Sequence, residues 1–117
     1  MPDEHLHTQP LTKLSEEEHL LRANVETFAK KEISPLVRKM DESASIPRNL
    51  IEQLFSLGLM GIEVPEQYGG ANGHFFLSIL AVEELARVDP SIAVMVDVQN
   101  TLVINAIKRW GLSLIHI

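Results

Sequence analysis

The sequence has no cysteine among its 117 residues, which excludes disulfide bonds, thiolate metal sites and a thiol nucleophile. It also has no long hydrophobic run. The longest, Ile92–Val96, is far too short to cross a bilayer, so we expect no membrane span. Positive charge is scarce, with 10 basic against 16 acidic residues and a formal net charge of -6. This balance argues against a nucleic-acid partner, because such partners favour a basic face.

The N-terminal segment lacks the marks of a targeting peptide. Its first arginine is Arg22, and Asp3, Glu4 and three consecutive glutamates precede that residue. A mitochondrial transit peptide is rich in arginine and poor in acidic residues, and a secretory signal needs an apolar centre. We therefore expect the chain either to be cytosolic or to lack its targeting segment already.

The first part of the chain predicts a helix behind a polar arm. Residues 1–12 hold two prolines and show no period, which indicates a flexible arm. The stretch Ser15–Glu18 has the form of a capping box, and apolar residues follow it at helical spacing. Pro35 interrupts the helix and starts a further turn that ends near Met40, before a short loop at 41–45.

A second helix is predicted from Pro47, a residue that suits a first helical turn. Gly58 is expected to end it in a left-handed conformation. The helical spacing of its apolar residues predicts a buried stripe. The members of this stripe are Leu50, Ile51, Leu54 and Phe55.

Two further helices complete the pattern. The third spans 75–88, and the fourth begins with Asp89 as its N-cap and Pro90 in its first turn, then ends at Gly111. No strand pair and no internal repeat are evident. The sequence therefore predicts an all-α fold of four to five helices, arranged as an orthogonal or up-down bundle, with an apolar connector rich in Gly and Pro at 58–70.

This connector, "GLMGIEVPEQYGG", is unusual between two helices because it is apolar and yet contains four glycines and a proline. We expect an extended path in which Leu59, Ile62 and Val64 alternate inward. Gly69 and Gly70 are then expected to reverse the chain, since glycine reaches positive φ at no steric cost.

The fourth helix is rich in β-branched residues, which have low helix propensity, so tertiary packing has to hold it. It is therefore expected to be central and buried. Its polar residues at 97, 101, 105 and 108 share one face. This stripe is either a solvated face, which is the commoner arrangement, or the edge of a cavity lined by Ala93, Val94 and Asp97. Spacing alone leaves both interpretations open.

No catalytic or metal-binding constellation is evident. Glu83 and Glu84 are adjacent on a helix and point apart, so they cannot act as an acid–base pair, whereas Glu83 and Arg87 suit an exposed ion pair. His5 and His7 have no third ligand nearby, and we expect no metal site. The three glycines at 69, 70 and 73 match neither phosphate-loop pattern. Composition and spacing thus indicate a scaffold or a partial pocket.

Two motifs nevertheless carry a specific resemblance. The stretches "LFSLGLMGIEVPEQYGGANG" and "AVEELARVDPSIAVMVDVQNTL", with the spacing between them, resemble the N-terminal helical domain of the acyl-CoA dehydrogenases. The similarity covers about Leu11 to Gly111, and the segment VQNTL resembles the short/branched-chain branch most. The resemblance implies domain boundaries of 1–12 for the arm and 13–111 for the helical domain.

The family resemblance implies an enzyme that uses FAD to oxidise an acyl-CoA thioester to its 2,3-enoyl form, in fatty acid metabolism or branched-chain amino acid degradation. In that family the glutamate base and most FAD contacts belong to later domains that these 117 residues do not contain. We therefore expect no catalytic residue here, and its FAD-contacting residues are unknown. The family also implies an electron-transfer flavoprotein partner, a homotetramer and the mitochondrial matrix.

The same resemblance implies a role for this domain as one wall of the acyl pocket. The positions that correspond to this wall are Ala93, Val94 and Asp97. Ala93 and Val94 are small and apolar and would set pocket depth. Asp97 fits an apolar acyl chain less well, because a buried unpaired carboxylate is costly.

The last six residues, 112–117, depart from the family pattern. The family continues after Trp110 and Gly111 with a polar helix start, whereas this chain ends in the uncharged "LSLIHI". The departure indicates a truncation, a frameshift or a foreign joint. A rival hypothesis is a stand-alone, non-catalytic helical interaction module that has kept the fold without the chemistry.

Overall fold

The computed structural model describes residue 10 and residues 12–115, with only the backbone described for 112–115. The predicted flexible arm therefore lies almost entirely outside the described residues. Within them the chain is helical and contains no strand, which confirms the predicted all-α fold. Its α-helices are α2 (Glu16–Phe28), α3 (Val37–Ser43), α4 (Arg48–Ser56), α5 (Phe75–Ala86), α6 (Pro90–Val98) and α7 (Ile104–Ile115).

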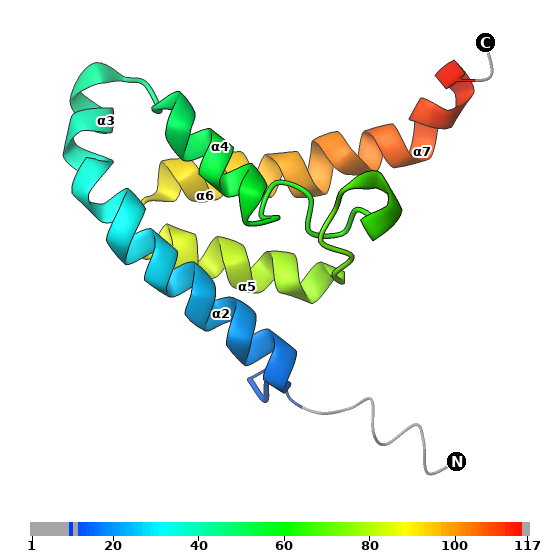
Figure 1. Ribbon diagram of the computed structural model, residues 1–117, viewed down its shortest axis with the longest axis horizontal. Coiled ribbons are helices and arrows are strands. Elements are labelled where there is room, and N and C mark those ends of the chain that lie inside the picture. The colour runs from blue at the N-terminus through cyan, green and yellow to red at the C-terminus, as the bar shows by residue number, and fades with distance from the viewer. Residues whose placement is uncertain (1–9, 11, 116–117) are drawn as a thin grey trace.

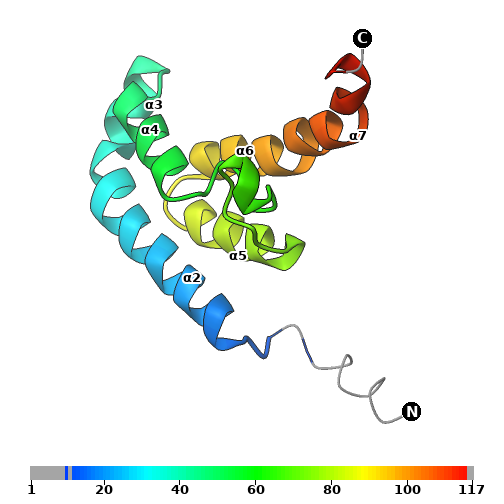
Figure 2. The same cartoon turned by 45° about the vertical axis from the view of Figure 1, so that its right-hand side comes forward.

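The helices form an open arrangement around one core. Helix α5 packs against both α6 and α2, and α7 continues away from the other helices in both views (Figures 1 and 2). The radius of gyration is 16.2 Å, whereas a compact domain of this length has about 13 Å. The fold is therefore more open than a compact domain of this length, and among the described residues α7 packs against no other α-helix outside its own continuous helix.

The first helix begins as its sequence predicts. The Ser15 hydroxyl accepts a hydrogen bond from the Glu18 N–H (3.2 Å), and the Glu18 carboxylate accepts one from the Ser15 N–H (2.7 Å). Pro35, however, does not interrupt the helical path, which continues from α2 into α3 without a loop. It lies in a 3₁₀ turn, Ser34–Leu36, at a position where its missing N–H costs little. The predicted loop at 41–45 was partly wrong, because α3 continues to Ser43.

Helix α4 ends where expected, since Gly58 adopts a left-handed φ of 79° directly after it. Leu50 and Leu54 are fully buried, whereas Phe55 is 57% exposed, so its assignment to the buried stripe was wrong. Residues 50 and 54 form a single row, and residue 55 lies about 100° further round the helix. Helix α4 contacts the core through the row that contains Leu50 and Leu54, so the Phe55 side chain lies outside this contact.

The core draws on the connector and on each of the helices α2 to α6. Its fully buried side chains include large aliphatic residues. They are led by Ile33, Leu50, Leu54, Leu59, Leu85, Ile92 and Val96. The prediction that the fourth helix is central and buried is confirmed on its inner side, because Ile92 and Val96 have no exposed surface.

The connector follows turns rather than the extended path that was predicted. A 3₁₀ turn, Glu66–Tyr68, follows Pro65, and the chain reverses at Gly69, whose φ is 83°. Leu59 and Ile62 point inward as expected, although Val64 is only half-buried. A buried extended segment needs hydrogen-bond partners for its backbone N–H and C=O groups, and a neighbouring strand is the usual source. Since the described residues offer none, the connector satisfies these groups by turning on itself.

The reversal brings 71–73 back alongside 61–64. The N–H groups of Ala71, Asn72 and Gly73 donate to carbonyl oxygens of residues 61, 64 and 62 at 3.0, 2.9 and 2.6 Å. Gly70 is required at this point, because a Cβ there would overlap the carbonyl oxygen of Val64. The predicted turn at Gly69 and Gly70 is thereby confirmed.

The fourth helix is longer than the sequence predicted. Helix α6 passes through a π-turn, Gln99–Val103, directly into α7, which continues past Gly111 to Ile115. Gly111 does not adopt a positive φ. A helical glycine costs only about 1 kcal/mol, and the residues after it keep helical geometry, so the stop that was assigned to Gly111 was wrong.

The segment Pro90–Gly111 has 22 residues and is long and apolar enough to cross a membrane by length and composition alone; an 18-residue window within it has a mean hydropathy of 1.2 and is 28% buried. Core helices of soluble proteins meet the same criterion. Here the inner row contributes to the core, and one buried side chain, Asn100, binds the connector. These contacts favour a core helix.

The two connector glycines Gly70 and Gly61 provide a matched pair for substitution. Gly70→Ala is expected to lower the free energy of unfolding by about 1–3 kcal/mol, because the new methyl group overlaps the Val64 backbone. Gly61→Ala brings its methyl group only into ordinary contact with Val64 and is expected to change stability by less than about 0.5 kcal/mol. Urea denaturation followed by circular dichroism measures both, and equal effects would contradict the turn geometry.

Candidate functional site

A buried asparagine joins the connector to the continuous helix formed by α6, the π-turn and α7, which we call the long helix. Asn100 is 1% exposed, and its Nδ2 donates to the carbonyl oxygens of Leu59 (2.7 Å) and Val96 (2.8 Å). Its Oδ1 accepts a hydrogen bond from the Ile62 N–H at 2.9 Å. Two carbonyl partners require the two donors of the amide, so the orientation of the side chain is unique. Sequence reasoning missed this residue.

Neighbouring polar side chains extend the same contact along the helix. Gln99 Nε2 donates to the carbonyl oxygen of Met60 at 3.3 Å, so the connector has two anchors on the π-turn. The Thr101 hydroxyl donates to the backbone carbonyl of Asp97 (2.8 Å), and Asn105 Nδ2 donates to that of Thr101 (2.7 Å). The predicted polar stripe is therefore half-buried at its start and exposed at its end.

The three residues predicted to form the acyl wall lie beside this contact, at the start of the long helix. Ala93 is buried in the core, Val94 is 58% exposed, and Asp97 is half-buried next to Thr101. Their side chains therefore do not share one cavity among the described residues. Val94 faces outward, and the wall that the family resemblance implies stays a prediction.

Val94 begins an apolar face that has no packing partner among the described residues. The face follows one side of the long helix from α6 through the π-turn into α7. Its exposed members are Val94, Val98, Leu102, Val103, Ile107 and Trp110. Contiguous apolar surface of this kind marks an interaction site. We call it the outer apolar face.

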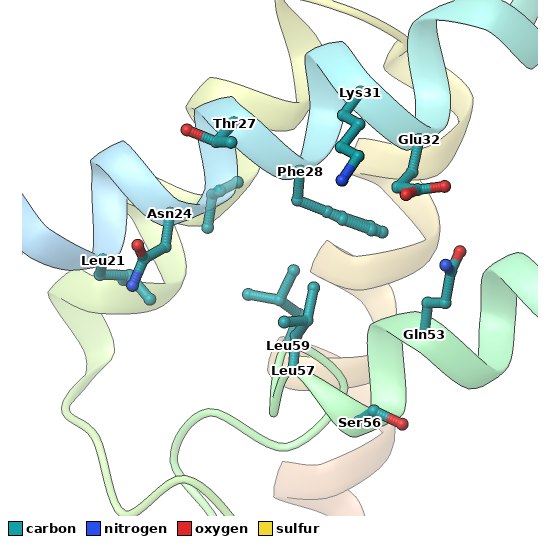
Figure 3. Close-up of a pocket in the computed structure, with 11 residues that line it drawn as sticks. Leu21, Asn24, Thr27, Phe28, Lys31, Glu32, Gln53, Ser56, Leu57 and Leu59 are labelled. Carbon is teal, nitrogen blue, oxygen red and sulfur yellow. The ribbon is translucent and has the colours of Figure 1, made fainter.

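A separate groove of about 510 Å³ opens between α2 and α4. Figure 3 shows Phe28, Leu57 and Leu59 pointing into it, with Asn24, Lys31 and Gln53 around its edge. None of the predicted wall residues lines it. This groove could not be predicted from the sequence, because its lining comes from two segments, 21–32 and 53–59, that are distant in the chain.

A buried carboxylate ties α2 to α5. Glu84 is 3% exposed, and its Oε1 lies 3.1 Å from Arg22 Nε and 3.7 Å from Arg87 Nε. Glu83 instead lies on the exposed side, where it pairs with Arg87 at 3.5 Å as predicted. The two glutamates thus point to different partners, in agreement with the geometric argument against an acid–base pair. On α2, the hydrogen bond and positive charge of Lys30 lower the pKa of Glu26.

Residues 15–113 match the family described as the N-terminal domain of acyl-CoA dehydrogenase. The chain belongs to the acyl-CoA dehydrogenase family. This match includes Leu112 and Ser113, the first two residues of the predicted atypical tail. His5 and His7 lie outside the described residues, and the absence of a metal site stays a prediction.

Two similar proteins are named as short/branched chain specific enzymes. The chain is 54% identical over 103 residues to a probable short/branched chain specific acyl-CoA dehydrogenase of Dictyostelium discoideum, covering 88% of this chain and 25% of that protein. It is 43% identical over 102 residues to the mitochondrial short/branched chain specific acyl-CoA dehydrogenase of Bos taurus, covering 87% and 24%. The chain therefore spans about a quarter of the length of these curated relatives.

A solved structure is also similar. Its title describes the electron transferring flavoprotein of Acidaminococcus fermentans and flavin-based electron bifurcation. The two structures align with a TM-score of 0.68 and 33% sequence identity, over 72% of this chain and 22% of that chain. The acyl-CoA dehydrogenase domain therefore has a structural relative as well as sequence relatives.

The family implies FAD, but the α2–α4 groove of this acyl-CoA dehydrogenase domain does not fit a flavin dinucleotide. The α2–α4 groove has an apolar floor, and its charged lining residues are Lys31 and Glu32, which are adjacent and opposite in sign. A pyrophosphate is held by several converging N–H donors or cations. The groove therefore offers no such cradle, and the prediction that later domains hold most of the cofactor stays a prediction.

Glu84 and Glu83 form a second matched pair in the acyl-CoA dehydrogenase domain. Glu84→Gln is expected to cost about 1–3 kcal/mol, because it removes a buried charge that two arginines share. Glu83→Gln is expected to cost less than about 0.5 kcal/mol, since its pair with Arg87 is exposed. Thermal and urea unfolding measure both losses. Similar small losses for the two variants would show that the Arg22 contact adds nothing.

Proposed function

We propose that this chain is the N-terminal domain of a flavin-dependent dehydrogenase that oxidises short or branched-chain acyl-CoA to the 2,3-enoyl-CoA. The observation that carries the proposal is the family match over residues 15–113 together with 43–54% identity to short/branched-chain enzymes. Because the chain spans about a quarter of those relatives, the activity belongs to the completed enzyme. FAD is held mainly by its other domains.

The domain's part in this reaction is to bound the acyl chain. Val94 presents a small apolar side chain to the outside of α6, and Ala93 next to it lies in the core and fixes how closely the helix backbone approaches. Such a surface suits an apolar acyl group. Asp97 lies one turn further along and is half-buried beside the Thr101 hydroxyl. It is better suited to the polar edge of the pocket than to the acyl chain.

The outer apolar face is the surface on which the remaining domains of the enzyme dock. It begins at Val94 and continues into α7, where residues 105–110 are all exposed. The relatives are about four times as long as the chain, so enough protein is available to cover this face. A pocket bounded by Val94 is then closed by the same surface that holds the domains together, as is common at domain interfaces.

The completed enzyme is further proposed to pass electrons to an electron-transfer flavoprotein and to form a homotetramer. Bos taurus and Rattus norvegicus relatives are named as mitochondrial, which supports the mitochondrial matrix as its location. The alternative is a stand-alone helical interaction module. Extending the reading frame past Trp110 separates the two, since a genuine expressed transcript without further domains would favour the module.

The isolated chain is expected to show no dehydrogenase activity with an artificial electron-accepting dye and short or branched acyl-CoA substrates. Within this proposal, the base that removes the α-proton is supplied by the remaining domains. The matched control is the same chain joined to those domains, which is expected to reduce the dye. Turnover by the isolated chain would overturn the proposed division of roles.

Enlarging the wall residue is expected to change which substrate the completed enzyme prefers. Val94→Phe should lower kcat/KM for a branched acyl-CoA by about 10-fold or more relative to a shorter straight one, because it fills part of the pocket. Leu102→Phe, further along the same face, is the control and should leave the ratio within about twofold. An unchanged ratio for Val94→Phe would place the acyl chain elsewhere.

A further inference from the structure

The long helix has an inward-facing row of buried residues spaced four positions apart. In an uninterrupted α-helix, residues at this spacing would not stay on one side of the helix. The residues of this row are Ile92, Val96, Asn100 and Ile104, all buried and each four positions after the last. With 3.6 residues per turn, each four-residue step drifts by about 40°, so the last would be about 120° away from the first. The π-turn Gln99–Val103 holds one extra residue, about 100°, and returns Ile104 to the row.

The same correction aligns the outer apolar face. Val94 and Val98 lie on α6, whereas Ile107 and Trp110 lie on α7, after the π-turn. In an uninterrupted helix the two groups would point about 170° apart. The extra residue reduces the difference to about 70°, so that both groups lie on the outward side of the helix. The π-turn therefore sets the register between the two halves of the face.

Asn100 is the residue that holds the π-turn in place. Its side chain donates to Val96, one turn earlier in the same helix, and to Leu59 of the connector. It also accepts a hydrogen bond from Ile62 of the connector. A π-turn is rare because its geometry is less favourable than that of an α-helix. These contacts favour it only while residue 100 faces the connector.

We propose that Asn100 is a positioning residue for the acyl pocket, acting through the register of the π-turn. It keeps Val94, at the substrate end of the outer apolar face, on the same side as Trp110, at the docking end. The functional part rests on the proposed function. The register itself is a property of this chain alone, and its test needs no activity.

The absence of cysteine makes the register directly measurable. Spin labels are attached to Val98→Cys and Trp110→Cys, and the distance between them is measured by pulsed electron spin resonance in the 117-residue chain. The two positions are about 18 Å apart along the axis and, with the π-turn, about 20° apart around it. Asn100→Leu should release the π-turn, rotate α7 by about 100° relative to α6, and shift or broaden this distance by several ångströms.

Two controls separate positioning from loss of stability. Leu50→Ala weakens the core far from the π-turn and should leave the distance unchanged. Deleting Leu102, an exposed residue of the π-turn, leaves an ordinary α-turn with the same register. The deletion should therefore keep the distance, and should restore it when combined with Asn100→Leu.

An unchanged distance in a folded Asn100→Leu variant would overturn the proposal, and so would a deletion that fails to restore it. If Asn100→Leu does not fold, the same labels are measured in Asn100→Ser, which leaves room for water at the freed backbone groups. The expected shift and its restoration by the deletion are the same. Because the readout is a distance in the free chain, its failure is distinct from a failure of the dehydrogenase assignment.

Discussion

The structure depends on the hydrogen bonds that Asn100 makes with the connector. Between α4 and α5 the chain has only a short 3₁₀ turn, Glu66–Tyr68, and no strand, and yet Leu59 and Ile62 of this segment lie in the core. Buried backbone groups without partners are costly. One buried amide satisfies two carbonyls and one N–H, and thereby joins the apolar connector and the helix that carries the proposed acyl wall into a single unit.

Function follows from what this unit leaves uncovered. The inner row of the long helix and the connector fill the core, so the outer side of the same helix is free for other contacts. The Glu84 carboxylate and its two arginines tie α2 to α5 below that helix. The Asn100 and Glu84 contacts together hold the connector, α2, α5 and the long helix in one packed unit. In the proposed enzyme, the acyl chain and the remaining domains bind to the outer side of this unit. The α2–α4 groove lies apart from that surface.

Local rules predicted the parts of the fold that depend on a few adjacent residues. The capping box at Ser15, the Asp89 cap before Pro90, and the left-handed turns at Gly58 and Gly69 all lie where the sequence places them. Predictions that needed tertiary information were weaker. Phe55 has the helical spacing of a buried residue, but α4 contacts the core through a narrower row that leaves it exposed. Gly111 is a typical helix stop, but the helix continues past it to Ile115.

The candidate site also depends on tertiary contacts that the sequence pattern did not predict. The wall residues Ala93, Val94 and Asp97 rest on family resemblance, and burial separates them in a way that spacing did not indicate. Asn100 was missed because it is polar and follows other polar residues. Its four-residue spacing from Val96 and Ile92 was the available signal, since this spacing places it on the inward row.

The most direct test of this account is an NMR measurement on the Asn100 side-chain amide. If the amide joins the connector to the helix, its two Nδ2 protons should exchange slowly with solvent. They should also show nuclear Overhauser contacts to Leu59 and to the Ile62 N–H. Rapid exchange of both protons without such contacts would mean that the connector and the long helix are not one unit.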